Sequence, residues 1–419
     1  MSADTIKDIV TRAKKAAPGL STLDTAVKDR TLLAMAVILD EGRAAIKAAN
    51  DLDVKKAVEG GKDPAFIDRL KLNDKRIDGM RDMMKEVAAL KDPLWKVIDR
   101  KERPNGLIVE KVRVPIGVIG IIYESRPNVT ADCIALCFKS GNAVILRGGT
   151  DAINSNKVIY SLLKKAASLE KLDEGVFQLI EDTKREAVDE MLQASWGIDL
   201  IMPRGGESLI RNVVEKSRIP VIKHYKGVCH VYIDLGSERN MALDIAYNAK
   251  VQRPGVCNAM ETLLVHEGAA GDILPEIARR YTEAGVVMKG CPVTVGILKA
   301  YDIVEAREED YYTEYSALKM NIRVVHSIDE AIAHISGYGS HHSDAIVTNN
   351  AASAEKFLRE VDSAAVYVNA STRFTDGGEF GLGAEIGIST DKIHARGPMG
   401  LEELTIYKYI VRGAGQIRR

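Results

Sequence analysis

The chain has 419 residues, of which 46% are hydrophobic, and its 58 basic and 59 acidic side chains leave a formal net charge of -1. A chain of this length has room for two or three domains with a large core, and its balanced charge argues against a nucleic-acid-binding protein, which normally carries a basic surplus. Five scattered cysteines without a CxxC pair, a polar N-terminus and no long apolar run predict a reduced cytoplasmic protein with no signal peptide and no membrane span.

The first ninety residues have the spacing of helices. Apolar side chains recur at helical intervals with charges between them, as at Val27, Ala34, Val37, Ile38 and Ala45. Gly60, Gly61 and Pro64 interrupt this pattern, and two further helices are expected near 64–72 and 74–90.

A charged hairpin is predicted at 98–115. Apolar and charged residues alternate on both sides of Pro104-Asn105-Gly106, and Asn-Gly between alternating runs is a strong hairpin signal. Such a ribbon is marginal alone, so it is either an arm that pairs with another subunit or an ordinary edge hairpin, and the residues alone favour neither. The β-prone segment 403–411 is expected to pair with the arm of a neighbouring subunit, which predicts a homodimer or tetramer.

An alternation of strands and helices follows the hairpin. Strands are expected at 116–122, 143–146, 176–180, 198–202, 220–223 and 229–233. Helices are expected at 129–140, 152–168, 184–195 and 207–217. This pattern is typical of a parallel sheet covered on both faces, and ligands of such sheets bind at the carboxyl ends of the strands.

Two glycine turns of this region are candidate phosphate sites. Arg147-Gly148-Gly149 and Arg204-Gly205-Gly206 each follow a strand and precede a helix. Glycines let backbone N–H groups approach a phosphate, and the helix N-terminus adds positive potential. Gly-Gly turns at strand ends also occur for steric reasons alone. The G-x-G-x-x-G fingerprint is absent, so the ordinary Rossmann mode of cofactor binding is not supported.

A second α/β pattern begins at residue 262. Strands are expected at 262–265, 286–288, 293–297, 322–325, 343–347 and 364–368. Helices are expected at 271–284, 328–336 and 351–360. A long glycine-rich polar loop, 369–387, follows the last strand, and its position favours a functional loop over a linker.

Cys257 is the candidate nucleophile. It follows a Pro-Gly turn between a predicted helix at 242–251 and the strand at 262–265, and such a turn can hold a side chain at the floor of a cleft. Arg253, four residues earlier, favours the reactive thiolate. On spacing alone, the alternative of a small buried apolar cysteine is more common. The eight histidines show no metal-ligand spacing, and the adjacent His341 and His342 are expected to point apart, so no metal site is predicted.

Four long motifs carry a family resemblance. They are Ile-Tyr-Glu-Ser-Arg-Pro-Asn-Val-Thr at 122–130, Gln-Arg-Pro-Gly-Val-Cys-Asn-Ala at 252–259, the loop at 368–385, and His-Ala-Arg-Gly-Pro-Met-Gly-Leu-Glu at 394–402. Together they resemble the gamma-glutamyl phosphate reductase family of the aldehyde dehydrogenase superfamily.

The resemblance implies an aldehyde dehydrogenase-like α/β fold, with two parallel-sheet α/β domains and a protruding β oligomerisation arm. It places the NADPH-binding domain at 1–97 and 116–250 and the catalytic domain with Cys257 at 251–370. The arm is assigned to 98–115 and 399–419, and the active-site loop with its return segment to 371–398.

The resemblance also implies a reaction. L-glutamyl 5-phosphate is reduced by NADPH to L-glutamate 5-semialdehyde and phosphate, the second step of proline biosynthesis, through a Cys257 thioester. The backbone N–H of Cys257 and the Asn128 side chain are the candidate oxyanion donors. Arg253 is assigned to the departing phosphate and Arg373 to the substrate α-carboxylate, with Asn258 beside them.

The family pattern assigns the NADPH cofactor to Ser125, Arg147, Gly148, Gly205, Gly206 and Glu314. Ser125 stands where many aldehyde dehydrogenases carry an asparagine donor. Arg147 falls where the adenosine ribose is held and favours a 2′-phosphate, Gly205 and Gly206 match the pyrophosphate turn, and Glu314 matches the nicotinamide-ribose ligand.

Two alternatives stay open. A hydrolytic or CoA-acylating aldehyde dehydrogenase would use the same cysteine, but hydrolytic relatives place a glutamate base in the region that here reads Lys223-His224-Tyr225-Lys226-Gly227, and a reductase does not need to activate water. A catalytically silent cofactor-binding scaffold would bind NADPH without turnover. The chain supplies no kinase, so contact with a glutamate kinase would be with a separate, transient partner.

Overall fold

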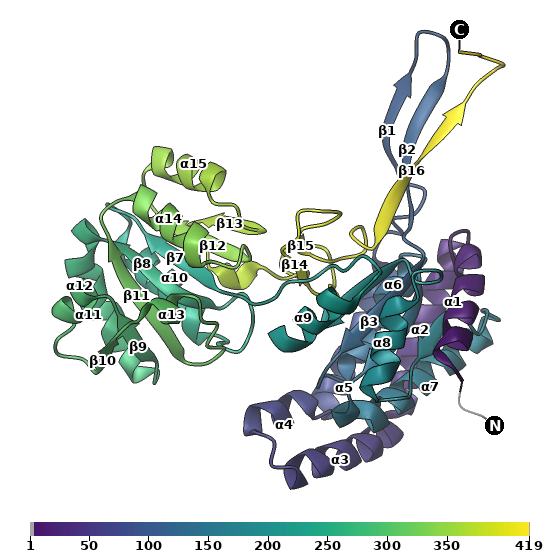
Figure 1. The fold of residues 1–419 in the computed structure, drawn as a ribbon, viewed down its shortest axis with the longest axis horizontal. Helices are drawn as coiled ribbons and strands as arrows, with labels where there is room; N and C mark the ends of the chain where they lie inside the picture. Colours follow the sequence, from purple (N-terminus) through teal and green to yellow (C-terminus); the bar gives the residue numbers. More distant parts are fainter. Residues whose placement is uncertain (1–3, 419) are drawn as a thin grey trace. The chain divides into compact units, whose positions relative to one another are not determined.

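The computed structural model describes residues 4–418, and by its internal contacts the chain forms two compact units. The first unit contains the chain up to Lys223 together with Gly381–Gly387 and Met399–Arg419, and the second contains His224–Phe380 and Ile388–Pro398 (Figure 1). Residues 1–3 and 419, the ends of the predicted NADPH-binding segment and arm, lie outside the described residues. Within the described part, no helix combines the length and the apolar character that crossing a membrane requires.

The first unit begins with a group of helices that start where local sequence favours a start. These are α1 (Ile6–Leu20), α2 (Thr25–Glu41), α3 (Arg43–Glu59), α4 (Pro64–Leu70) and α5 (Asp74–Ala89). The side chains of Asp24, Asp63 and Asn73 each accept a hydrogen bond from a backbone N–H in the first turn of α2, α4 and α5. These caps satisfy donors that a helix otherwise leaves unpaired.

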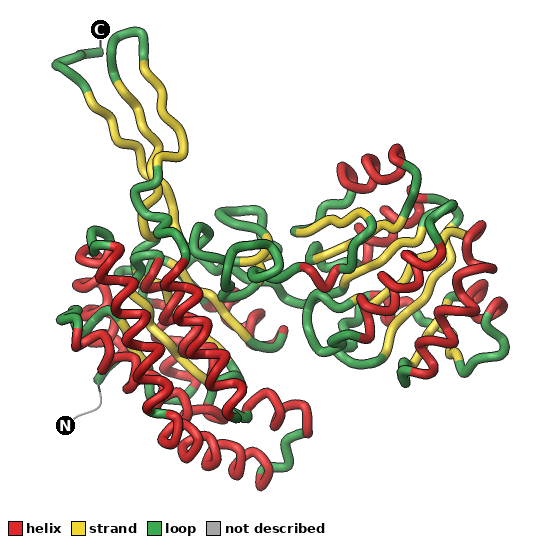
Figure 2. Tube along the Cα trace, turned by 180° about the vertical axis from the view of Figure 1, so that it is seen from behind, coloured by secondary structure: helices red, strands yellow, loops and turns green. Residues whose placement is uncertain are grey.

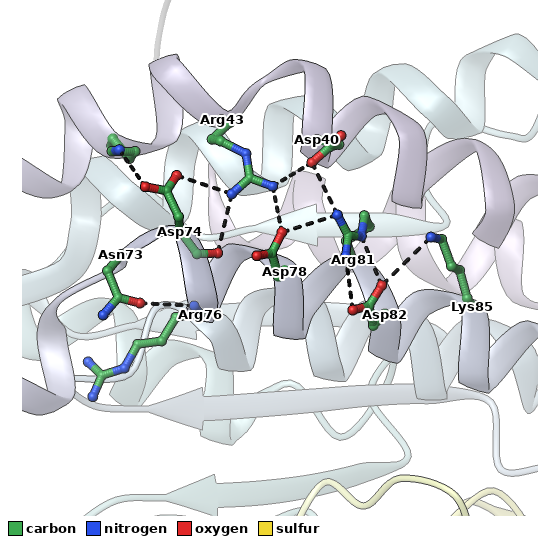
Figure 3. Close-up of polar contacts among 10 residues, drawn as sticks. Asp40, Arg43, Asn73, Asp74, Arg76, Asp78, Arg81, Asp82 and Lys85 are labelled. Carbon is green, nitrogen blue, oxygen red and sulfur yellow. Dashed lines mark hydrogen bonds and ion pairs between the residues drawn. The ribbon is translucent and has the colours of Figure 1, made fainter.

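A network of ion pairs joins α2, α3 and α5 at the surface (Figure 3). The Arg43 guanidinium reaches Asp78 at 2.7 Å and Asp74 at 3.1 Å, and it also pairs with Asp40. Arg81 extends the network to Asp78 at 3.1 Å. These charges are exposed enough for salt to screen them, so the network orients the helices more than it stabilises them.

The sheet of the first unit is parallel and has the strand order β5-β4-β3-β6. Its strands are β3 (Val118–Tyr123), β4 (Ala143–Gly148), β5 (Phe177–Leu179) and β6 (Leu200–Arg204). Its helices are α6 (Asn128–Lys139), α7 (Ile153–Leu169), α8 (Arg185–Gln193) and α9 (Glu207–Lys216), with a 3-10 turn, η1 (Thr150–Ala152), before α7. Every residue of β3 and β4 is buried, as expected for strands covered on both faces. The strand predicted at 220–223 is reduced to a single bridge between Val221 and Ile201.

The predicted hairpin forms, and a third strand joins it. β1 (Val97–Glu102), β2 (Ile108–Pro115) and β16 (Thr405–Arg412) make an antiparallel sheet in the order β1-β2-β16, which extends from the helices of its unit (Figures 1 and 2). The Glu110 carboxylate is buried between the guanidiniums of Arg100 and Arg412. The prediction had paired the terminal strand with a neighbouring subunit, whereas β16 takes β2 of its own chain as partner.

The second unit is built on a seven-stranded parallel sheet in the order β10-β9-β11-β8-β7-β12-β13. Its strands are β7 (Cys229–Ile233), β8 (Met260–His266), β9 (Val287–Gly290), β10 (Ile303–Glu305), β11 (Lys319–Val325), β12 (Ser343–Val347) and β13 (Ala365–Val368). Its helices are α10 (Arg239–Val251), α11 (Glu267–Glu283), α12 (Pro292–Ile297), α13 (Glu308–Tyr311), α14 (Ile328–Tyr338) and α15 (Ala351–Glu360). A 3-10 turn, η2 (Thr372–Phe374), and a short antiparallel pair, β14 (Ile388–Ser389) with β15 (Gly397–Pro398), complete it.

Two strand predictions were wrong in detail. The strand at 229–233 was grouped with the earlier strands, but β7 lies in the second sheet between β8 and β12. The apolar run at 293–297 is the helix α12, which begins with Pro292 in its first turn. Proline is well placed there because its fixed φ suits a helix start and its missing N–H would have no helical partner.

Helices cover both faces of the second sheet. Val231 and Ile233 pack on one side with α10 and α11, whereas Tyr232 between them packs on the other side with α14 and α15. Side chains alternate across a strand, so a strand buried on both faces must be apolar throughout. The expected architecture of two parallel-sheet α/β units is therefore confirmed.

Candidate active site

Cys257 lies in the turn between α10 and β8, at the amino-terminal end of a central strand. The turn closes with a hydrogen bond from the Ala259 N–H to the Val256 carbonyl, 3.0 Å long. Cys257 is half-buried, unlike Cys133, Cys137 and Cys229, which are buried. A thiol that is partly accessible and held by a short turn between two rigid elements suits a nucleophile.

The backbone of Cys257 is packed against Gly227. A Cβ atom added at residue 227 would overlap the Cys257 carbonyl group, so only glycine fits there. The Cys229 thiol donates to the Cys257 carbonyl oxygen at 3.2 Å. Burial raises the pKa of Cys229 well above its usual value, which keeps this thiol protonated as a donor and leaves Cys257 as the accessible sulfur.

Asn258 fastens the glycine-rich loop to the turn of Cys257. Its carbonyl accepts from the Thr372 hydroxyl at 2.7 Å, and its side-chain amide donates to the Thr375 carbonyl at 2.8 Å. The Arg373 guanidinium donates to the Asn258 side-chain oxygen and, at 2.8 Å, to that of Gln252. The structure thus brings the predicted substrate residues Asn258 and Arg373 to the turn that carries Cys257.

The guanidiniums of Arg253 and Arg373 lie near each other and near Cys257. Burial lowers the pKa of Arg373, the nearby charge of Arg253 lowers it further, and a negative charge at Cys257 would raise it. Arg253 itself is exposed. Two cations that repel each other beside one thiol form a place where an anionic group is favoured.

A buried ion pair, which the sequence analysis missed, closes the base of the turn. Lys250 Nζ lies 2.7 Å from Glu261 Oε2, and both side chains are fully buried. Burial lowers the pKa of Lys250 and raises that of Glu261 to about 7. The other Glu261 oxygen accepts from the Ser316 N–H at 3.2 Å, which ties in the segment that carries Glu314. The sequence did hold a signal for this pair. Lys250 near the end of α10 and Glu261 near the start of β8 are charged residues among apolar neighbours.

Two histidines, which the sequence analysis set aside, also lie at this turn. His342 is fully buried, and its ring centroid is 5.6 Å from that of His224. Each offers a nitrogen within 4.8 Å of the Cys257 sulfur. His224 precedes β7, Cys257 precedes β8 and His342 precedes β12, so the cluster forms at the amino-terminal edge of the sheet, where sequence spacing gives no signal.

The predicted cofactor residues of the first unit follow the carboxyl ends of its strands. Ser125, just after β3, has a φ of 50°. Asn128 begins α6, and its side-chain amide donates to the Asp132 carboxylate at 2.8 Å. Burial raises the pKa of Asp132 to about 6. Arg147 is the penultimate residue of β4 and is buried. Its Nη2 donates to the Thr183 carbonyl at 2.6 Å and to the Lys184 carbonyl at 3.1 Å.

One glycine in each predicted phosphate turn, Gly148 and Gly205, lies close to a neighbouring side chain. A Cβ atom at Gly148 would collide with the Asn156 side chain, and one at Gly205 would lie 2.5 Å from Glu124 Oε2. At the N-terminus of α9, the Gly206 N–H donates to this same carboxylate oxygen at 3.1 Å. The helix start therefore already accepts a negative group, as its dipole and free N–H groups favour.

The predicted site residues fall into two sets, one in each unit. The second unit holds Arg253, Cys257, Asn258, Glu314 and Arg373. The first unit holds Ser125, Asn128, Arg147, Gly148, Gly205 and Gly206. Their assigned roles remain predictions.

Comparison with known proteins gives one family. The family model described as aldehyde dehydrogenase family matches residues 1–294. The chain is 55% identical to gamma-glutamyl phosphate reductase of Caldanaerobacter subterraneus subsp. tengcongensis, over 97% of this chain and 98% of the relative. It is 53% identical to the protein of that name from Aquifex aeolicus, over 99% of this chain and 96% of the relative.

Solved structures agree with these relatives. The gamma-glutamyl phosphate reductase of Thermotoga maritima superposes with a TM-score of 0.96 at 47% identity, covering 99% of this chain and all of that one. An acetylating aldehyde dehydrogenase of Geobacillus thermoglucosidasius, with a TM-score of 0.70 at 16% identity, covering 99% of this chain and 97% of that one, shares the fold. The predicted resemblance is confirmed, and the chain is an oxidoreductase that belongs to the gamma-glutamyl phosphate reductases of the aldehyde dehydrogenase family.

Proposed function

We propose that the protein reduces L-glutamyl 5-phosphate with NADPH to L-glutamate 5-semialdehyde and phosphate, the second step of proline biosynthesis. One observation carries the proposal beyond the family name: a half-buried cysteine has two guanidiniums near it, that of Arg253 in its own turn and that of Arg373, which is hydrogen-bonded to this turn. A substrate that carries both a phosphate and a carboxylate has anionic groups for two such cations.

Cys257 acts as the nucleophile. Its thiolate attacks the acyl carbon, the bond from that carbon to the phosphate oxygen breaks, and phosphate leaves with the electron pair, so that a thioester remains on the sulfur. The fixed backbone at Gly227 and the hydrogen bond from Cys229 hold the turn still during the attack. The oxyanion accepts a hydrogen bond from the backbone N–H of Cys257.

The first unit has residues that fit a nicotinamide dinucleotide. The Gly206 N–H at the start of α9 already donates to a carboxylate, so this helix N-terminus suits a pyrophosphate, and Gly205 has no room for a side chain. Arg147 places a positive charge at the end of β4, which favours a 2′-phosphate. NADPH, when bound, supplies the hydride that reduces the acyl group to the aldehyde.

The absence of a glutamate base suits this chemistry. Residues 223–227 contain no glutamate, and the Glu261 carboxylate is fully buried against Lys250. A thioester that waits for hydride lasts longer when these positions supply no carboxylate to activate water.

The reaction is tested in reverse with purified protein, glutamate 5-semialdehyde, NADP⁺ and phosphate. We expect NADP⁺ reduction to require phosphate, and to be slower with NAD⁺. Reduction that proceeds without phosphate would replace the proposal with a hydrolytic dehydrogenase. Reduction that needs CoA in place of phosphate would replace it with a CoA-acylating enzyme.

Replacing the nucleophile gives the sharpest variant. In Cys257→Ser, NADPH binding should survive and turnover should fall by roughly a thousandfold or more, because a serine hydroxyl is a far poorer nucleophile than a thiolate. Cys291→Ser, a change to another partly accessible cysteine, is the matched control and should keep wild-type turnover. Near-normal activity of Cys257→Ser would contradict the thioester mechanism.

A further inference from the structure

The cluster of His224, Cys257 and His342 has the composition of a metal site. One potential ligand atom from each residue lies within 4.8 Å of the other two, although the three residues come from separate segments of the chain. We propose that these side chains bind a Zn²⁺ ion through two imidazole nitrogens and one thiolate. The ion would occupy the sulfur that the proposed reaction uses, so the site is inhibitory.

The donor set and the spacing both suit zinc. Imidazole and thiolate are the ligands that Zn²⁺ prefers, and a site with three protein ligands leaves a fourth position for water. Bond lengths of about 2.0–2.3 Å at tetrahedral angles place ligand atoms about 3.4–3.6 Å apart. The three atoms, which lie within 4.8 Å of one another, must therefore approach by at most about 1.4 Å. Side-chain rotation in a half-buried cysteine and a half-buried histidine can supply this movement.

The hydrogen bonds of His224 prepare it as a ligand. Its Nδ1 lies 2.8 Å from the Ile388 carbonyl oxygen, which only accepts, so Nδ1 carries the proton. In the neutral ring Nε2 then carries the free lone pair. Histidines that bind metals commonly donate their second nitrogen to a backbone carbonyl in this way.

His342 is prepared by burial. Its Nε2 is buried and has no hydrogen-bond partner among residues 4–418, which is costly for a polar atom and calls for an explanation. Its Nδ1 lies 2.9 Å from the Ser343 hydroxyl, which continues to the Thr375 and Tyr367 hydroxyls at 2.6 and 2.7 Å.

Charges of both signs lie near the cluster. The Glu314 carboxylate acts electrostatically on His342 and so attracts a cation, whereas Arg253 and Arg373 repel one. On binding, the S–H bond of Cys257 breaks, its proton passes to solvent and an S–Zn bond forms. No electron is transferred.

Binding is measured without reference to activity. The purified full-length protein is stripped with a chelator and titrated with Zn²⁺ by calorimetry, and Co²⁺ is used as a spectroscopic substitute. We expect one Zn²⁺ per chain and, with Co²⁺, a near-ultraviolet thiolate-to-cobalt charge-transfer band. Bound Zn²⁺ should also protect Cys257 from alkylation, as read by peptide mass spectrometry.

Variants identify the ligands. Cys257→Ser should abolish the cobalt band, and His224→Gln and His342→Gln should each weaken Zn²⁺ binding at least tenfold. Cys291→Ser and His326→Gln, which change an accessible thiol and an exposed imidazole outside the cluster, should bind as the wild type does. Thermal melts report whether the variant of the buried His342 folds. If it does not fold, the effect of His224→Gln on Zn²⁺ binding decides whether the histidines are ligands. Absence of stoichiometric binding, or unchanged binding in Cys257→Ser or His224→Gln, would overturn the proposal.

The inhibitory consequence rests on the proposed function, so it is tested separately. Zn²⁺ should suppress the phosphate-dependent reaction at the concentrations at which it binds, and a chelator should restore the rate. A protein that binds Zn²⁺ but has no activity would overturn the proposed function and leave the metal site standing. An active enzyme that Zn²⁺ does not inhibit would overturn the inhibitory role.

Discussion

At the scale of the residue, the candidate site depends on close packing around one thiol. Gly227 touches the backbone of Cys257, Cys229 donates to its carbonyl, and Asn258 fastens the adjoining loop. These contacts are local and restrict the movement of the cysteine backbone. Catalytic groups lose rate steeply when they are misplaced.

Gly227→Ala tests this packing. The added methyl group would overlap the Cys257 carbonyl, so the turn must shift, and we expect kcat to fall about a hundredfold while NADPH binding is retained. Gly271→Ala is the control, because a Cβ there meets nothing within 4 Å. This helical position should gain up to about 1 kcal/mol of stability and keep full activity. Wild-type turnover in Gly227→Ala would show that the contact does not position the nucleophile.

Arg253→Ala tests the phosphate assignment. The side chain is exposed, so its removal should leave the fold intact. Loss of a charge-assisted hydrogen bond to phosphate, typically about 1.5–3 kcal/mol, should raise the KM for phosphate in the reverse reaction at least tenfold. Arg359→Ala, which changes an exposed arginine of α15, should leave this KM unchanged. An unchanged KM in Arg253→Ala would assign the phosphate to another group.

At the scale of the element, α14 carries a buried titratable ring. His334 packs against the rings of Tyr311 and Tyr338, with centroids 5.0 and 4.4 Å away. Burial lowers its pKa to about 2, with His230 and Arg323 adding to the effect. The unfolded chain binds this proton near pH 6.5 and the folded chain does not. The stability contributed is complete above pH 6.5 and is lost as the pH falls from 6.5 toward 2.

Denaturant titrations at pH 7.5, 6.5 and 5.5 measure this loss. Below pH 6.5 we expect His334 to contribute a fall in the free energy of unfolding of up to about 1.4 kcal/mol per pH unit. His334→Phe should reduce that slope, because phenylalanine does not titrate and suits the aromatic neighbours. His326→Gln, which changes an exposed histidine, should alter it little. An identical slope in His334→Phe would exclude this ring as the source.

Elements were more predictable from sequence than their assembly. Local periodicity set most helices and strands, and the Asn105-Gly106 turn set the hairpin. The assignment of β7 to the second sheet was not predictable, because a short apolar strand does not encode its neighbours. The histidine cluster was equally hidden, since His224 and His342 meet Cys257 only through the order of the strands. The turn of Cys257 was found because its motif is contiguous.

At the scale of the whole molecule, the three-stranded arm presents apolar side chains to solvent. Those exposed on its strands are Val97, Ile98, Ile406, Tyr407, Tyr409 and Val411. A sheet this small is marginal when neither face is covered, and apolar patches of this kind commonly mark an interface. The expected homodimer or tetramer would cover this surface.

Light scattering coupled to size-exclusion chromatography tests the assembly. The wild type should elute as a dimer or tetramer, and the double variant Tyr409→Lys, Val411→Lys should dissociate. Loss of two buried apolar side chains, about 3 kcal/mol or more, weakens association on the order of a hundredfold. Leu169→Lys, which changes an exposed residue of α7, should not alter the mass. A monomeric wild type would contradict the prediction of a homodimer or tetramer.

The chain passes between the two units four times, after residues 223, 380, 387 and 398. The strands β14 and β15 of the second unit come after the third crossing, and β16 of the first unit comes after the fourth. On the ribosome, therefore, the second unit is incomplete until Pro398 has been made, and the first is incomplete until β16 has been made. Most multidomain chains can fold their N-terminal domain while the rest is being made, whereas here the segment 381–412 completes both units.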